Sequence, residues 1–131
     1  MSKIRREAQR HHCGDLVVDA NEAWYIGAFA RYAPALAKLG VDLIEQPLHA
    51  DRDAALIGLS HPVPLCADES CHDRHSLPHL QGRYEAVNIK LDKTGGLTEA
   101  LALRNASMVA GFKIMVGCMV GTSLSMAPAH L

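Results

Sequence analysis

The sequence predicts an α/β fold in which about five parallel strands alternate with crossover helices. Short apolar runs recur along the 131 residues, and each is followed by a polar turn and a longer, mixed segment. The runs are continuously apolar rather than alternating, which is typical of strands buried on both faces of a parallel sheet. Aromatic residues make up only 5% of the chain, fewer than an all-β sandwich usually contains.

The first half of the chain supplies two strands and the helix between them. Residues 15–21 (DLVVDAN) form the first predicted strand, and residues 21–40 form a helix that stops at Gly40. Pro34 lies inside this helix and predicts a kink or a restart, because proline lacks the N–H that the helix needs. Residues 41–47 (VDLIEQP) form the second strand.

The second half repeats this alternation. Helix or helix-and-turn segments are predicted at 51–60, 72–83 and 96–111, and strands at 63–70, 85–91 and 112–119. In the last helix, Thr98 is the candidate N-cap and Gly111 the stop signal. A further element begins near residue 122.

Composition indicates one domain over residues 1–131, because no linker or low-complexity tract interrupts the pattern. The chain is 49% hydrophobic and has a net charge near −1, so neither a nucleic-acid nor a membrane partner is expected. It has no uncharged apolar run of about 18 residues and no apolar stretch at its charged N-terminus. Its four cysteines form no CxxC pair. A cytoplasmic protein with reduced thiols is therefore expected.

Charged side chains recur where successive predicted strands end: Asp19, Glu45, Asp68 and Lys90. They are 26, 23 and 22 residues apart, and each interval fits one strand and one crossover helix. Because the carboxyl ends of parallel strands meet at one edge of a sheet, we expect these four side chains to lie close together.

Three neighbouring carboxylates repel one another unless a cation lies among them. Oxygen ligands favour a hard ion, so Asp19, Glu45 and Asp68 predict a Mg²⁺ site. Lys90, partly desolvated beside the ion, would have a lowered pKa and serve as a proton-transfer base. The ion would hold a substrate carboxylate and stabilise the charge that develops as the α-proton leaves. Taken singly, each acid is more often a helix cap, and a lone lysine at a strand end is usually solvated. Their recurrence at four successive strands favours the site.

The segments "DAN", "EQP", "ADES" and "NIKLDKTGG" together resemble the strand-end motifs of the enolase superfamily, in its muconate-lactonizing subgroup. "NIKLDKTGGLTEAL" with "GCM" is most similar to the dipeptide epimerases that act on L-Ala-D/L-Glu. The resemblance implies Mg²⁺ ligands at Asp19, Glu45 and Asp68, and an acid/base lysine at Lys90. It further implies supporting roles for Asn21 and Glu69, a supporting or surface position for Lys93, and at most a pocket-lining role for Cys118 and Met119.

The resemblance also implies an eight-stranded (β/α) barrel with a capping domain, of which this chain would supply about five strands. The family's second acid/base lysine lies in a K-x-K motif before "DAN", and Lys3 is too close to Asp19 to correspond to it. The capping domain and the last strand, with its DxD motif, are likewise expected to be absent. The chain by itself would then have one base and little or no turnover. A homo-oligomer that buries the open barrel edges is a further hypothesis.

Other interpretations stay open. The fold could serve a muconate cycloisomerase, an o-succinylbenzoate synthase or an N-succinylamino acid racemase, or the chain could be a non-catalytic scaffold. The "HHC" at 11–13 lacks the ligand spacing of a zinc site, so surface histidines are favoured. His72, His75 and His79 have helical spacing and predict a solvated helix face. Trp24, Phe29 and Leu36 are predicted to pack in or against the core.

Overall fold

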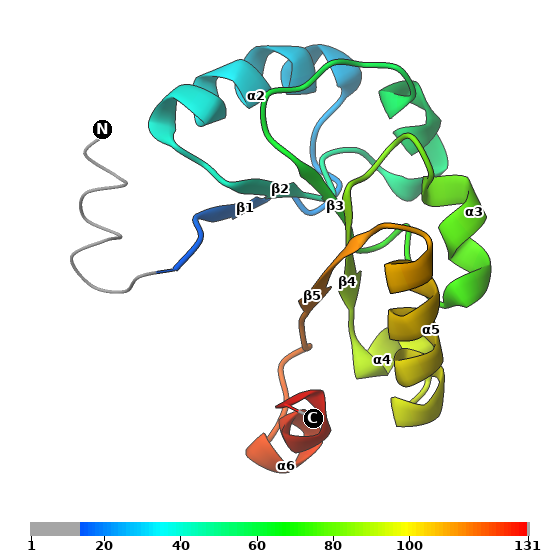
Figure 1. Ribbon diagram of the computed structural model, residues 1–131. Coiled ribbons are helices and arrows are strands. Elements are labelled where there is room, and N and C mark those ends of the chain that lie inside the picture. The colour runs from blue at the N-terminus through cyan, green and yellow to red at the C-terminus, as the bar shows by residue number, and fades with distance from the viewer. Residues whose placement is uncertain (1–13, 131) are drawn as a thin grey trace.

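The strands form one parallel sheet, as predicted. The structure is a computed structural model that describes residues 14–130. The sheet has five strands in the order β1-β2-β3-β4-β5, so each strand pairs with its neighbour in the sequence (Figure 1). The strands are β1 (Val17–Asp19), β2 (Leu43–Glu45), β3 (Leu65–Ala67), β4 (Ala86–Ile89) and β5 (Lys113–Val116). This order is that of a sector of a (β/α) barrel.

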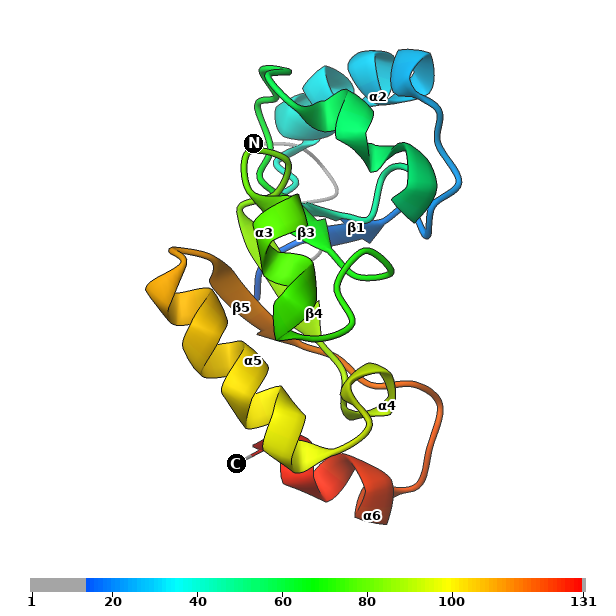
Figure 2. The same ribbon diagram turned by 90° about the vertical axis from the view of Figure 1, so that its right-hand side faces the viewer.

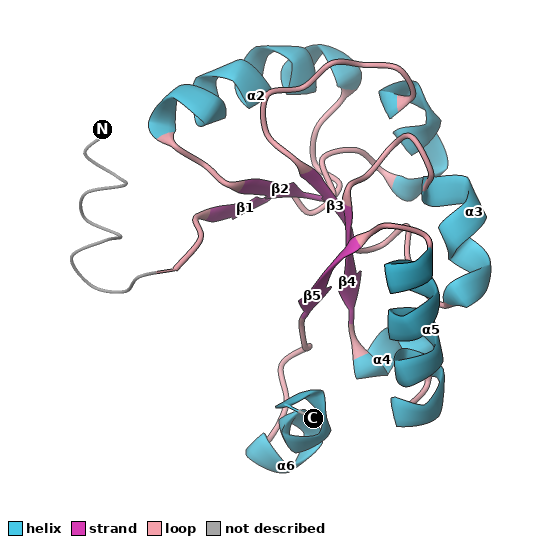
Figure 3. Cartoon of the chain, in the orientation of Figure 1, coloured by secondary structure: helices cyan, strands magenta, loops and turns pink. Residues whose placement is uncertain are grey.

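Helices lie outside this curved sheet (Figures 1 and 3). Figure 2 shows α5 beside β4 and β5, and α2 at the β1 end of the sheet. The helical elements are α2 (Ile26–Leu39), η1 (Ala50–Leu56), η2 (Arg74–Ser76), α3 (Leu77–Leu80), α4 (Leu91–Thr94), α5 (Leu97–Val109), α6 (Ser123–Met126) and η3 (Ala127–His130). No helix in the described part of the chain is long and apolar enough to cross a membrane.

The helix predicted over 21–40 begins only at Ile26. Asn21 and Glu22 have positive φ angles of 48° and 62°, which no helix accommodates. The segment that follows forms isolated bridges to Leu48 instead of a first helical turn. The helix does not restart at Pro34 but continues through it to Leu39, with Gly40 in the left-handed conformation at its end, as predicted.

The structure also decides the other helix predictions. The N-cap of α5 is Gly96, at a φ of 134°, and no side chain caps the helix, so Thr98 is not its cap. Gly111 follows the helix with a φ of 87° and fits the predicted stop. The short helix predicted at 51–60 is a 3₁₀ helix that ends at Leu56. The helix and turn predicted at 72–83 are present as η2 and the four-residue helix α3, whereas α4 was not predicted.

The core lies between the sheet and the helices. Every residue of β3 and β4 is buried, whereas β1 and β5 at the two edges are largely exposed. Burial on both faces therefore holds for the central strands, and Val17 and Val116 are 37% and 53% exposed at the edges. Phe29 is buried, and Trp24 and Leu36 pack against the core, as predicted. The homo-oligomer that would cover the edges stays a prediction.

The described cysteines differ sharply in accessibility, which gives a simple test of the packing. Cys118 is exposed, whereas Cys66 and Cys71 are buried. Burial raises the pKa of the Cys71 thiol to about 11 and raises that of Cys66 as well. We expect a thiol reagent at pH 8 to modify Cys118 at least about 100-fold faster than either buried cysteine. Peptide mapping by mass spectrometry measures the three rates, and equal rates in the folded chain would contradict this packing.

Candidate active site

The four residues predicted at the ends of successive strands lie together at the carboxyl-terminal end of the sheet. Asp19 and Glu45 are the last residues of β1 and β2, and the register pairs them directly. Asp68 follows β3 by one residue. Lys90 follows β4 directly and is the N-cap of α4. The spacing along the chain thus predicted the neighbourhood correctly.

Asp68 is buried, and two lysines contact its carboxylate. Lys90 Nζ contacts Oδ2, and Lys93 Nζ lies 2.5 Å from Oδ1. Burial by itself would raise the pKa of Asp68, but the hydrogen bonds and charges of the two lysines outweigh burial and hold that pKa below its ordinary value. Asp68 is therefore an ionised group with both oxygens engaged.

The pKa of Lys90 differs from the sequence-based expectation. Burial lowers it, but the hydrogen bond and charge of Asp68, together with the charges of Glu45 and Glu69, outweigh burial and raise the pKa. The groups of the protein therefore stabilise the ammonium form. The lowered pKa that was predicted requires a cation that offsets the negative charge of Asp68.

Glu45 is a buried carboxylate held by a neighbouring strand. Its Oε1 accepts a hydrogen bond of 2.6 Å from Asn88 Nδ2. Burial raises the pKa of Glu45, and the charges of Asp19 and Asp68 raise it further. Asp19 is exposed, and its Oδ1 accepts a hydrogen bond of 2.8 Å from the backbone N–H of Asn21. Glu45 is thus close enough to both Asp19 and Asp68 for their charges to repel its own.

A cation suits these residues by the chemistry of their donors. Buried acceptor oxygens of Asn88 (Oδ1) and Glu69 (Oε2) have no hydrogen-bond partner among the described residues. Unpartnered oxygens beside repelling carboxylates favour a hard cation. Within residues 14–130, however, no three His, Cys, Asp or Glu side chains are already arranged to hold an ion, and Asp68 faces two ammonium groups. The assignment of Asp19, Glu45 and Asp68 as metal ligands stays a prediction.

Comparison with known proteins supplies the family. The family described as "Enolase C-terminal domain-like" matches residues 1–131. The chain belongs to this family. Among curated relatives, "N-acetyl-D-glutamate racemase" of Pseudoalteromonas sp. is 58% identical over 115 residues, which are 88% of this chain and 36% of that protein. "L-Ala-D/L-Glu epimerase" of Escherichia coli (strain K12) is 57% identical over 114 residues, 87% of this chain and 36% of that protein.

A solved structure agrees with these relatives. It is an enolase family member from Agrobacterium tumefaciens with homology to dipeptide epimerases, with bound sodium and L-Ala-L-Glu. It is 50% identical with a TM-score of 0.88, and the match covers 97% of this chain and 39% of that one. The chain therefore spans little more than a third of the proteins that it resembles.

The structure decides between the positions expected for several residues of the enolase-family motifs. Lys93 has the supporting position rather than the surface one, because its ammonium lies against Asp68. Asn88 precedes Lys90 by two positions, and the backbone is extended through Lys90, so the two side chains point to the same side and that spacing could have indicated Asn88. Cys118 and Met119 are exposed and line a small cavity beside α4. His72, His75 and His79 are exposed, and Lys3 and residues 11–13 lie outside the described part.

Gln46, the middle residue of "EQP", organises the turn after β3. It is fully buried with a φ of 31°, a conformation that costs a non-glycine residue about 1–3 kcal/mol. Its Oε1 accepts hydrogen bonds from the backbone N–H groups of Asp68 (2.9 Å) and Ser70 (3.1 Å). Its Nε2, which carries two N–H donors, lies within 2.8–3.0 Å of three acceptors, Leu48 O, Ser70 Oγ and Tyr84 OH. Gln46 therefore fixes the backbone that carries Asp68.

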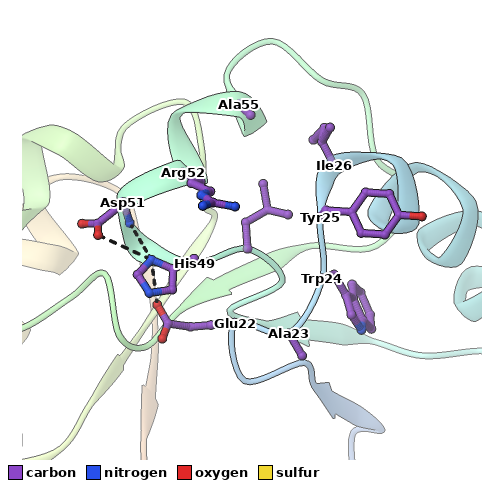
Figure 4. A pocket seen from close by; sticks show the side chains of 10 residues that line it. Glu22, Ala23, Trp24, Tyr25, Ile26, His49, Asp51, Arg52 and Ala55 are labelled. Atoms are coloured by element: carbon purple, nitrogen blue, oxygen red, sulfur yellow. Dashed lines mark hydrogen bonds and ion pairs between the residues drawn. The ribbon is translucent and has the colours of Figure 1, made fainter.

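A cavity lies apart from the strand-end cluster. Its volume is about 600 Å³, and it lies between the segment before α2 and the 3₁₀ helix η1 (Figure 4). Figure 4 shows Trp24 and Tyr25 across from His49. His49 Nδ1 lies 3.9 Å from Glu22 Oε1 and 3.7 Å from Asp51 Oδ2. None of the four strand-end residues lines this cavity.

Proposed function

We propose that this chain carries part of the active site of a Mg²⁺-dependent isomerase that abstracts the proton α to a carboxylate, with L-Ala-D/L-Glu dipeptides as substrates. The observation that carries the proposal is the contact between Lys90 and Asp68. This contact lies at the carboxyl-terminal end of the sheet, where β1 and β2 end with Asp19 and Glu45. A proton-transfer amine beside three carboxylates suits that chemistry. The names of two relatives, an epimerase and a racemase, support it.

Each residue has a distinct role in this proposal. Asp19, Glu45 and Asp68 would hold Mg²⁺, which supplies positive charge for the substrate carboxylate and for the charge that develops at the α-carbon. Lys90 Nζ would take the α-proton and return it. Its side chain is 15% exposed, so it is accessible from one side while its stem stays packed.

One base serves one face of the substrate. Epimerisation requires that a proton leaves one face of the α-carbon and that another arrives at the opposite face. Among the described residues, Lys90 is the group proposed for this transfer. The 131-residue polypeptide by itself is therefore expected to exchange the α-proton with solvent but not to invert the centre.

Exchange in D₂O tests the proposal. The chain at high concentration is incubated with Mg²⁺ and, in separate samples, with L-Ala-L-Glu or L-Ala-D-Glu, and ¹H NMR follows the α-proton of the glutamate residue. We expect the signal of one epimer to fade without appearance of the other epimer, and EDTA to stop the fading. Absence of exchange from both epimers with saturating Mg²⁺ would overturn the proposed reaction, whereas rapid interconversion of the epimers would overturn the single-face assignment.

Racemisation of an N-acylated amino acid is the second candidate, because the relative named N-acetyl-D-glutamate racemase is as similar as the epimerase. L-Ala-Glu and N-acetylglutamate both contain a glutamate whose α-amino group is acylated and whose α-carboxylate is free. The same residues would therefore act on both. The same assay with both enantiomers of N-acetylglutamate distinguishes the two candidate reactions, because the preferred substrate should exchange its α-proton faster. For a non-catalytic scaffold, neither substrate would exchange, and Mg²⁺ would bind weakly.

A further inference from the structure

We propose that Lys93 is a positioning residue that fixes Asp68 through one carboxylate oxygen and leaves the other oxygen for a cation. This inference rests on the proposed function, because it gives Asp68 its orientation as a Mg²⁺ ligand. It gives Lys93 a role distinct from that of Lys90, although the two lysines are three positions apart and contact the same carboxylate.

The contacts of Lys93 occupy every proton of its ammonium group. Nζ lies 2.5 Å from Asp68 Oδ1, 2.6 Å from Asp68 O and 2.8 Å from Asn88 O. An ammonium has three N–H donors, so none is left for a substrate. The side chain is 13% exposed, and its acceptors belong to β4 and to the residue after β3. Lys93 therefore joins two strand ends rather than facing a ligand.

Lys90 contacts the other oxygen of the same carboxylate. Its Nζ lies against Asp68 Oδ2, and no other hydrogen bond from this ammonium is found among the described residues. Two lysines thus divide one carboxylate, with Lys93 on Oδ1 and Lys90 on Oδ2. Because Lys93 also holds the backbone carbonyl of Asp68, the carboxylate has little freedom to rotate. Oδ2 is the oxygen that can exchange the Lys90 ammonium for a cation.

The short helix α4 accounts for the spacing of the two lysines. Lys90 is its N-cap, and Gly95 closes it in the left-handed conformation with a φ of 72°. Positions three apart lie on one side of a helical turn, so both ammonium groups reach Asp68. A neutral residue at position 93 would leave Oδ1 of Asp68 without a charged donor. Burial of the ionised carboxylate would then cost more free energy.

Titration calorimetry with Mg²⁺ tests the inference on the whole chain. We expect Lys93→Met to weaken Mg²⁺ binding about 10–100-fold, the usual effect of removing a residue that orients a metal ligand. Lys93→Arg keeps a charged donor and should recover most of that loss. Lys113→Met is the matched control, because Lys113 is exposed at the opposite end of the sheet, and its affinity should equal that of the unmodified chain.

The outcomes separate this inference from the proposed function. If Lys93→Met binds Mg²⁺ as tightly as the unmodified chain, Lys93 does not position Asp68, and the proposed function stands. If the unmodified chain binds no Mg²⁺, both fail.

A second measurement decides the question if Lys93→Met does not fold. The ¹⁵Nζ resonances of the lysines are followed during Mg²⁺ addition and assigned with Lys90→Met and Lys93→Arg. We expect a slowly exchanging ammonium signal from Lys93 that persists, while the Lys90 signal changes. Loss of the Lys93 signal on Mg²⁺ addition would overturn the inference.

Discussion

A chain carrying Lys90→Met is expected to lose Mg²⁺-dependent exchange of the substrate α-proton by about 10²–10⁴-fold, the range that a positioned acid or base contributes. Methionine keeps most of the length of the side chain but has no proton to give or accept. Lys93 still holds Oδ1 of Asp68, so the buried carboxylate keeps a charged partner. The variant should therefore fold, and its loss should lie in the reaction rather than in stability. The D₂O exchange measured by ¹H NMR gives the ratio directly.

The control for this variant is Lys113→Met, which removes a lysine from the opposite end of the sheet. It should exchange the α-proton at the rate of the unmodified chain. Circular dichroism should show the same helix content in both variants. Exchange that persists in Lys90→Met within about threefold of the unmodified rate would show that another group moves the proton.

The sequence predicted the strand ends because a repeated physical unit generates them. Each strand and crossover helix returns the chain to the same end of the sheet. Residues at regular spacing along the chain, one at each strand end, are therefore brought close together. Asp19 and Glu45 accordingly pair in register, and Lys90 reaches Asp68. The proximity of the strand ends follows from the strand topology and not from side-chain contacts. It was therefore predicted correctly even though the helical elements between the strands were predicted less well.

The contacts of Lys93 and Gln46 could not be predicted, because no periodicity reports them, and the resemblance left Lys93 as either a supporting or a surface residue. The position of Lys93 follows from α4, a helix of four residues and thus too short for a helical pattern. Gln46 connects to groups 22 to 38 residues away, and its backbone adopts a φ that sequence propensities disfavour. The late start of α2 has a similar cause, because Asn21 and Glu22 adopt positive φ.

The ionisation of Lys90 shows how two predicted effects compete. The sequence predicts partial burial, which lowers the pKa of an amine, and carboxylates nearby, which raise it. Without coordinates their balance is unknown, and in the structure the contact with Asp68 decides it. The same contact is the one that a cation on Asp68 Oδ2 would replace. Geometry at one oxygen therefore determines whether Lys90 is held as an ammonium or is available for proton transfer.

Asp53→Asn is expected to lower the free energy of unfolding by about 3 kcal/mol, because it removes one partner of a buried ion pair. Asp53 is 2% exposed, and its carboxylate accepts hydrogen bonds from Arg83 (2.6 Å), Ser70 Oγ (2.7 Å) and Tyr84 OH (3.1 Å). The side chain of Arg83 is 20% exposed, so some hydration of its charge remains and the lower end of the usual 3–5 kcal/mol range applies. Ser70 and Tyr84 also bond to Gln46, so the substitution should weaken the hydrogen bonds that hold the turn with Asp68.

Urea unfolding followed by the fluorescence of Trp24, the only tryptophan, measures this change. Asp51→Asn is the matched control, because the Asp51 side chain is 89% exposed and should change stability by less than about 0.5 kcal/mol. If Asp53→Asn were as stable as that control, Arg83 and the hydroxyl groups would have to find other partners. Gln46 bonds the backbone N–H of Asp68 and also contacts Ser70, a partner of Asp53. Weakened Mg²⁺ binding by a folded Asp53→Asn chain would therefore connect this buried network to the strand-end carboxylates.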